Sequence, residues 1–101
     1  MLTSKQRAYL RSLASKLDPI ISIGKDALTP EVTKQTDEAL AARELVKLSV
    51  QKNCTADLRE LCDSLAERTQ SEPVQVIGRK IVLYRPGKDE KKKIVLPRDK
   101  A

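Results

Sequence analysis

The chain has 101 residues, enough for one domain with a modest core, and its formal net charge is +6. It contains no histidine, tryptophan or phenylalanine. Because histidine is the commonest general base and metal ligand, we expect no enzyme, no metal site and no cofactor. No apolar run approaches the roughly 20 residues that span a bilayer, and the N-terminal segment lacks the apolar centre of a secretory signal. We therefore expect a cytoplasmic protein with no membrane partner.

The charge is concentrated at the two ends of the sequence. Residues 1–25 carry five basic and one acidic side chain, residues 26–84 carry eight and ten, and residues 85–101 carry seven and three. This distribution favours a polyanion, and nucleic acid above all, over a small-molecule substrate. The alternative is a basic surface that is merely solvated. With Tyr9 and Tyr84 as the only aromatic residues, the sequence gives little basis for binding through base stacking.

The two cysteines do not predict a functional site. Cys54 and Cys62 have no histidine and no second cysteine pair with which to bind zinc. On one helix they would lie about 12 Å apart along the axis, beyond the reach of about 7 Å that a disulfide allows. We expect reduced thiols, with Cys62 filling the core.

The predicted elements begin with a helix that Thr3 or Ser4 can cap. Its apolar residues recur at spacings of three and four up to about Leu17, and Pro19 ends it. A short β-branched run at residues 20–23 then predicts a buried strand.

A loop of small and polar residues at 24–27 joins this strand to a second helix. Thr29 suits the N-cap and Pro30 the first helical position. A glycine loop that meets a helix N-terminus can approach a phosphate closely, because the helix end contributes unpaired N–H groups and partial positive charge. Lys25 adds a full charge suited to non-specific phosphate contact. The alternative is an exposed loop lysine without a role.

The rest of the chain alternates strands and helices. The expected elements are a helix from Pro30 to about Ala42, a strand from Leu45 to Gln51, a helix capped by Thr55 with Asp57 in its first turn, and strands at 74–77 and 81–84 joined by a Gly78–Arg79 turn. This order predicts an α+β fold, a two-layer α/β domain in the order α-β-α-β-α-β-β, with a four-stranded mixed sheet and three helices. We expect residues 1–98 to form one domain, and residues 86–101 to be a basic tail that is partly flexible. Residues 94–96 form either a short edge strand or part of a disordered tail.

Several segments together resemble a known family. They are Leu-Thr-Ser-Lys-Gln-Arg at 2–7, residues 19–30, Ala-Arg-Glu-Leu-Val-Lys at 42–47, and residues 74–85 and 94–98. In this order they are similar to the stand-alone, YhbY-type CRM domain, named for chloroplast RNA splicing and ribosome maturation. The resemblance implies a fold related to the C-terminal domain of translation initiation factor 3, and RNA binding. For bacterial stand-alone members it also implies association with precursors of the large ribosomal subunit.

The resemblance further implies an RNA-contacting Gly-x-x-Gly loop, like that of KH domains, at Gly24, Lys25, Asp26 and Ala27. The sequence departs from that pattern at Ala27. If the backbone there is left-handed, alanine costs about 1–2 kcal/mol; if the glycine serves only close approach, one methyl group is tolerated. Asp26 and Glu31 carry negative charge that disfavours a nearby phosphate.

Further candidate RNA contacts are basic residues near the two ends: Lys5, Arg7, Arg11, Arg79, Lys80 and Arg85. Each alone is more often a solvated surface charge than a contact. Tyr84 either stacks on a base or, as we prefer, packs within its strand. We expect a non-enzymatic RNA-binding protein that binds ribosomal RNA in large-subunit precursors and assists assembly. The alternative is an adaptor that docks on ribosomal proteins or assembly factors.

Overall fold

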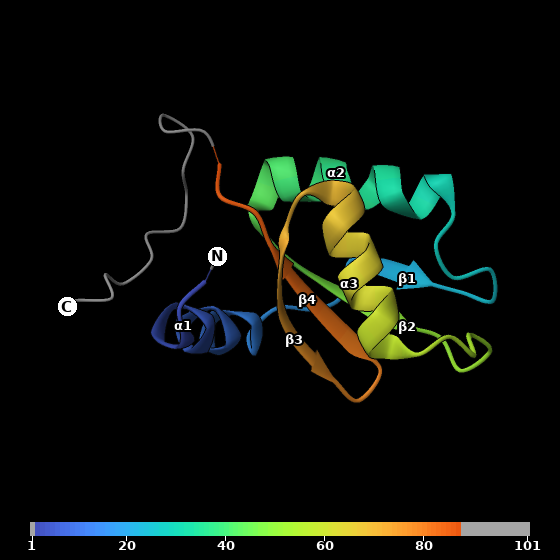
Figure 1. Cartoon of the computed structure of the whole chain (residues 1–101), viewed down its shortest axis with the longest axis horizontal. Coiled ribbons are helices and arrows are strands. Elements are labelled where there is room, and N and C mark those ends of the chain that lie inside the picture. Colours follow the sequence, from blue (N-terminus) through green and yellow to red (C-terminus); the bar gives the residue numbers. More distant parts are fainter. Residues whose placement is uncertain (1, 88–101) are drawn as a thin grey trace.

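A computed structural model describes residues 2–87, so the predicted strand at 94–96 and nearly all of the tail lie outside the described residues. Three helices and four strands follow the predicted order (Figure 1). Their bounds are α1 (Ser4–Ala14), β1 (Ile21–Ile23), α2 (Pro30–Arg43), β2 (Leu45–Val50), α3 (Leu58–Thr69), β3 (Glu72–Ile77) and β4 (Lys80–Tyr84). Within this range no helix is long and apolar enough to cross a membrane.

Helix α1 begins as predicted and ends early. Thr3 and Gln6 form a capping box, in which each side chain accepts from the other residue's backbone N–H. The helix stops at Ala14 instead of near Leu17, because the chain tightens into a turn. The amide of Leu17 donates to the Ala14 carbonyl at 3.0 Å. Lys47 Nζ, from β2, donates to the carbonyls of Ala14 and Leu17 at 3.1 and 3.2 Å. A distant lysine thus caps this helix end.

The other two helices also begin at side-chain caps. Thr29 accepts from the Val32 amide at the start of α2, with Pro30 in the first turn, as predicted. The predicted Thr55 cap of α3 is wrong: Asp57 caps it, accepting from the amides of residues 59 and 60. Thr55 and Asp57 are both residue types suited to an N-cap. Asp57 takes this position because it immediately precedes the first helical residue, where its side chain reaches the free amides of the first turn.

The four strands form one mixed sheet in the order β1-β2-β4-β3. Strands β1 and β2, joined through α2, are parallel, and β4 is antiparallel to both β2 and β3. The two-residue turn that joins β3 to β4 has Gly78 at φ 57°, as a tight hairpin favours. Pro73 lies at an irregularity of the outer strand β3, where it removes no interior ladder bond.

Alternating side chains of the sheet enter two separate cores, and helices cover both faces of the sheet (Figure 1). Helices α2 and α3 pack on one face, where Leu48 and Ile81 are fully buried. Helix α1 packs on the opposite face, where Leu10 contacts the cluster that contains Val82 and Tyr84. The predicted two layers account for the sheet with α2 and α3, and α1 adds a partial third layer. It packs mainly against β2, β4 and β3.

The reactive side-chain candidates are packed in the interior. Cys54 and Cys62 are free and buried, as expected for core residues. Burial raises the pKa of the Cys62 thiol from 9.0 to about 11, so this thiol stays protonated and unreactive at neutral pH. Tyr84 is only 2% exposed and its pKa is raised, mainly by burial and secondarily by Glu44. The packed interpretation of Tyr84 is confirmed, and the ring is not available for stacking.

Candidate functional site

Three loops meet at one end of the sheet (Figure 1). Strands β1 and β2 are parallel with Ile23 beside Val50, so their carboxyl ends lie together. Ser49 pairs with Lys80, the first residue of β4, which brings the hairpin turn to the same end. The loops at 24–29, 51–57 and 78–79 therefore form one edge of the molecule, which we call the loop end.

The predicted glycine loop is a tight turn at this loop end. The Ala27 amide donates to the Gly24 carbonyl at 3.0 Å, which leaves the side chains of Lys25 and Asp26 exposed at the tip. A Cβ atom built on Gly24 would lie 3.6 Å from Gln51 Oε1, an ordinary contact. Gly24 thus leaves its backbone uncovered for a ligand. The local geometry does not by itself require glycine at this position.

Ala27 occupies the left-handed region, with φ 54°. The structure therefore selects the costly alternative of the two that the sequence left open: the position does require a left-handed backbone. The methyl group of Ala27 packs against the core under α2 and α3, and this contact offsets part of the strain.

Glycine at position 27 should stabilise the fold slightly. Relief of about 1–2 kcal/mol of left-handed strain is opposed by about 0.5–1 kcal/mol of glycine backbone entropy and by lost methyl packing. For Ala27→Gly we expect the free energy of unfolding to rise by up to about 1 kcal/mol in urea denaturation. A loss of stability would mean that the methyl contact outweighs the strain. The matched control is Ala41→Gly, at an exposed helix position, which should lose about 1 kcal/mol.

The amino end of α2 has few backbone donors to offer an anion. Pro30 has no N–H, Thr29 Oγ1 accepts from Val32, and the Thr33 amide donates to the Thr29 carbonyl. Glu31, in the same turn, adds a negative charge. The positive end of the helix is therefore weaker here than the sequence suggested, and the charge of Lys25 matters more.

Arg79 braces the loop end from the hairpin turn. Its Nε donates to the Val50 carbonyl at 3.0 Å, and its Nη2 donates to the carbonyls of Gln51 and Cys54 at 2.6 and 2.9 Å. In return, the Val50 amide donates to the Arg79 carbonyl at 2.8 Å. A guanidinium that donates to three carbonyls has few donors left for a ligand. In this structure Arg79 therefore holds the 50–54 segment in place.

Gln51 connects this braced loop to the glycine loop. Its amide donates to the Ile23 carbonyl and its Nε2 donates to Ser22 Oγ, both at 2.8 Å. The backbone beside Gly24 is thereby fixed to the 51–54 segment. The loop end is one connected unit whose exposed cations include Lys25 and Lys52; the sequence analysis did not single out Lys52.

Lys80 lies on the sheet face opposite α2 and α3. It pairs with Ser49, which pairs with Ser22, and directly paired residues point to the same face. This row of small polar side chains and one lysine lies beyond the cover of α1 and beside the loop end.

Arg85 has a structural position at the other end of the sheet. Its Nη1 donates to Asp37 Oδ1 at 2.6 Å and to the Thr69 carbonyl at 2.8 Å, and its Nη2 donates to the Asp37 carbonyl at 2.9 Å. The residue thus ties the end of β4 to both α2 and α3. The structure does not bring it to the loop end.

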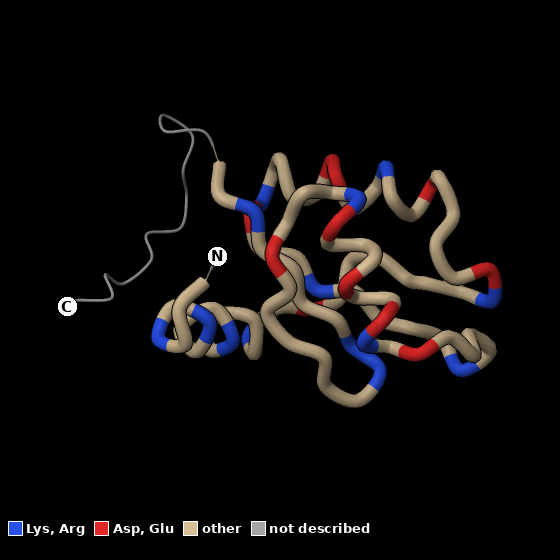
Figure 2. The backbone as a smooth tube through the Cα atoms, viewed as in Figure 1, with Lys and Arg blue, Asp and Glu red and all other residues tan. Residues whose placement is uncertain are grey.

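Helix α1 carries the remaining candidates, and basic positions recur along it (Figure 2). Lys5 and Arg11 are exposed and Arg7 is partly buried. Arg7 and Arg11 line a polar cleft along β3 together with Arg59 of α3. Sequence reasoning missed Arg59, although one signal was present: a cation in the first turn of a helix opposes the helix dipole.

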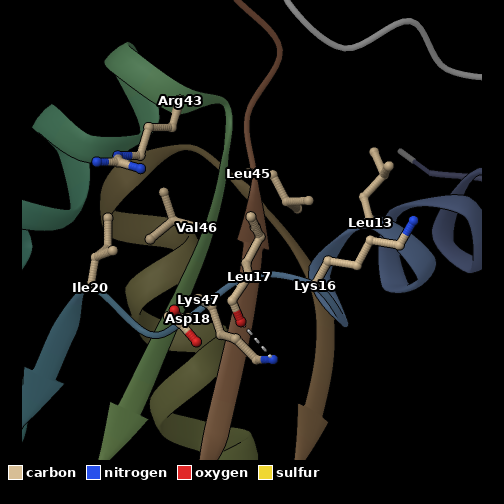
Figure 3. Close-up of a pocket in the computed structure, with 9 residues that line it drawn as sticks. All are labelled: Leu13, Lys16, Leu17, Asp18, Ile20, Arg43, Leu45, Val46 and Lys47. Atoms are coloured by element: carbon tan, nitrogen blue, oxygen red, sulfur yellow. Dashed lines mark hydrogen bonds between the residues drawn. The ribbon is translucent and has the colours of Figure 1, made fainter.

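An apolar pocket of about 370 Å³ lies at the opposite end of the sheet, where β1 and β2 begin (Figure 3). Leu17 and Ile20 contribute exposed apolar surface, with exposures of 37% and 44%. The aliphatic stem of Lys47 crosses the pocket while its Nζ reaches the Leu17 carbonyl. Because it lies at the far end of the strands, this pocket is separate from the loop end.

Comparison with known proteins agrees with this geometry. The family model for the CRS1/YhbY (CRM) domain matches residues 2–85. The probable RNA-binding protein YqeI of Bacillus subtilis is 46% identical over 97 residues, covering 96% of this chain and all of YqeI. A protein of Haemophilus influenzae named RNA-binding protein is 35% identical over 97 residues, covering 96% of each chain. The solution structure of SAV1595 from Staphylococcus aureus has a TM-score of 0.82 and 50% identity, covering 96% of this chain and all of SAV1595.

The fold and the loop end define a small α+β domain with a braced glycine loop between a strand and a helix. With the family model matching nearly all of the described residues, the chain belongs to the CRS1/YhbY (CRM) domain family.

Proposed function

We propose that this protein binds RNA without catalysing a reaction, and that the loop end carries the contact. The RNA is ribosomal RNA in precursors of the large ribosomal subunit, and the protein assists their assembly in the cytoplasm. Family membership and the names of two relatives as RNA-binding proteins support the RNA class. The ribosomal and cytoplasmic parts rest on the resemblance to stand-alone CRM domains.

The single observation that carries this proposal is the turn at Gly24–Ala27. It presents Lys25 at an exposed tip, beside backbone that has no side chain at Gly24 to shield it. The turn is fixed through Gln51 and Arg79, so little conformational entropy is lost when a phosphate binds. Lysine is a point charge and Tyr84 is buried, so the site reads backbone and shape rather than base identity.

Removal of the Lys25 charge should weaken RNA binding across sequences. One lost phosphate contact reduces the slope of log affinity against log salt by about 0.7–0.9, which is about four- to sixfold in affinity at 0.15 M salt. Lys25→Ala should show both effects in fluorescence anisotropy titrations with a labelled hairpin RNA. The fold should be unaffected, because the Lys25 side chain is exposed.

Lys16→Ala is the matched control, since Lys16 is also exposed but lines the pocket at the opposite end of the sheet. It should leave the salt slope unchanged. Equal effects of the two substitutions would indicate a diffuse charge effect and contradict the loop assignment.

The ribosomal part of the proposal has a separate test: tagged protein should co-migrate with free large subunits or their precursors in a sucrose gradient. That association should disappear after ribonuclease treatment, and protein that stays at the top of the gradient contradicts it.

The second candidate function is an adaptor that docks on a ribosomal protein or assembly factor. One observation favours it: the apolar pocket with exposed Leu17 and Ile20, which the RNA proposal leaves unused. An adaptor predicts co-purification with such a protein that survives nuclease treatment and is lost in Ile20→Ser. Co-purification that is lost after nuclease treatment would contradict the adaptor function.

A further inference from the structure

A polar cleft of about 410 Å³ runs along β3, at the edge of the sheet. Its charged side chains are Arg7, Arg11 and Arg59, and the remaining wall is the β3 segment 73–76. Because β3 has a sheet neighbour on one side only, its outer edge presents backbone groups to this cleft.

The three arginines reach the cleft from opposite sides of the sheet. Arg7 and Arg11 are four residues apart on α1, so they project from the same side of that helix. Arg59 comes from the first turn of α3, which packs on the other face. Three guanidinium groups from two helices therefore converge across one strand edge.

This arrangement is electrostatically unfavourable by itself. Like charges four residues apart on a helix repel, and a cation in the first turn of α3 opposes the helix dipole. Within residues 2–87, no ion pair is found between these three side chains and a carboxylate, in contrast to Arg85, which pairs with Asp37. Asp63 lies one turn after Arg59 without pairing to it. An anion in the cleft would remove these costs.

The chemistry of the lining specifies the anion. A guanidinium is a planar fork of donors that matches two oxygens of a phosphate at once, and it is weakly hydrated. A phosphodiester and a carboxylate each offer two oxygens to one such fork, so three guanidinium groups around one cleft fit several anionic groups in succession, as a nucleic-acid backbone presents them.

We infer that Arg7, Arg11 and Arg59 form a second phosphate site, which holds the backbone of the RNA at the β3 edge. This inference rests on the proposed function, because it takes RNA as the ligand. The cleft is next to the loop end: Arg59 is the second residue of α3, which follows the 51–57 loop, and β3 leads into the Gly78–Arg79 turn. RNA that contacts Lys25 at one loop and Arg59 beyond another is clamped at two places, which fixes its direction across the domain.

The test compares two arginines of the same helix. Arg59 and Arg68 are both exposed on α3, nine residues and thus about 13 Å apart along the axis. Arg59→Gln should weaken binding of a labelled hairpin RNA about four- to sixfold at 0.15 M salt and reduce the salt slope by about 0.7–0.9. Arg68→Gln, with the same change in net charge, should do neither. Arg59→Lys should recover the slope but only part of the affinity, because lysine lacks the fork.

A second measurement keeps the result independent of folding defects. In NMR titration of the wild-type protein with the same RNA, the Nε–Hε signals of Arg7 and Arg59 should shift together, whereas that of Arg68 should not. If Arg59→Gln and Arg68→Gln behave alike and the Arg59 signal does not move, the second site is overturned while RNA binding through Lys25 stands. If the wild-type protein binds no RNA, the proposed function itself fails. Equally tight binding of a polyglutamate chain in the cleft would replace the phosphate ligand with an acidic protein.

Discussion

Replacement of Arg79 by alanine is expected to lower the free energy of unfolding by about 2 kcal/mol. Three carbonyls lose a charged donor, and hydrogen bonds to charged groups contribute about 1.5–3 kcal/mol each where water cannot replace them. Water can replace part of them here, because the Gln51 side chain beside this contact is exposed. Urea denaturation measures the loss, and amide hydrogen exchange should show faster opening at residues 51–54.

Lys80→Ala is the matched control, since it removes one charge from the adjacent residue without breaking any of these bonds. It should change stability by less than about 0.5 kcal/mol. Arg79→Lys separates the two roles of the residue. If Arg79 braces the loop end, Arg79→Lys should lose most of the stability that Arg79 contributes, because lysine cannot reach three carbonyls at once. If Arg79 is only a phosphate contact, Arg79→Lys should retain its RNA affinity. Full stability in Arg79→Lys would argue against bracing.

Arg85→Ala should cost a similar amount, about 2 kcal/mol, at the other end of the sheet. The ion pair with Asp37 contributes the smaller part, because the Asp37 side chain is 57% exposed and such pairs contribute at most about 1 kcal/mol. The larger part comes from the carbonyls of Thr69 and Asp37, which lose their donor. Thermal denaturation followed by circular dichroism measures this loss.

Asp37→Asn tests that division, because it removes the charge but keeps the backbone carbonyl. It should cost less than about 1 kcal/mol, and this cost should shrink further at high salt. The RNA affinity of folded Arg85→Ala should match the wild type, since the Arg85 guanidinium donates to residues of α2 and α3 and not to a ligand. A large loss of affinity at full folding would instead restore Arg85 as an RNA contact.

The local elements were largely predictable. Several signals act within a few residues and can therefore be recognised in the sequence. They are the capping residues Thr3 and Thr29, the proline at the start of α2 and the glycine of the hairpin. The errors are at ends fixed from a distance. Helix α1 stops early where Lys47 of β2 binds its last carbonyls, and nothing between residues 4 and 17 encodes that contact.

The candidate site was predictable to the level of the glycine loop and its lysine. Whether Ala27 is strained was not, because left-handed backbone at alanine is decided by the turn it closes. Arg59 was missed because it joins Arg7 and Arg11 only when α1 and α3 pack on opposite faces of the same edge strand.

The sequence by itself determined the order of helices and strands, the family, and the concentration of positive charge, since these depend on local preference and on residue types in order. Only the tertiary structure decided what each cation does. Arg79, Arg85 and Lys47 donate to carbonyls of distant segments. Lys25, Arg7 and Arg59 face solvent or a cleft with no carboxylate partner among residues 2–87. The physical reason is that a cation's role depends on the acceptors that folding brings within about 3 Å of it, and for these residues those acceptors come from remote parts of the chain.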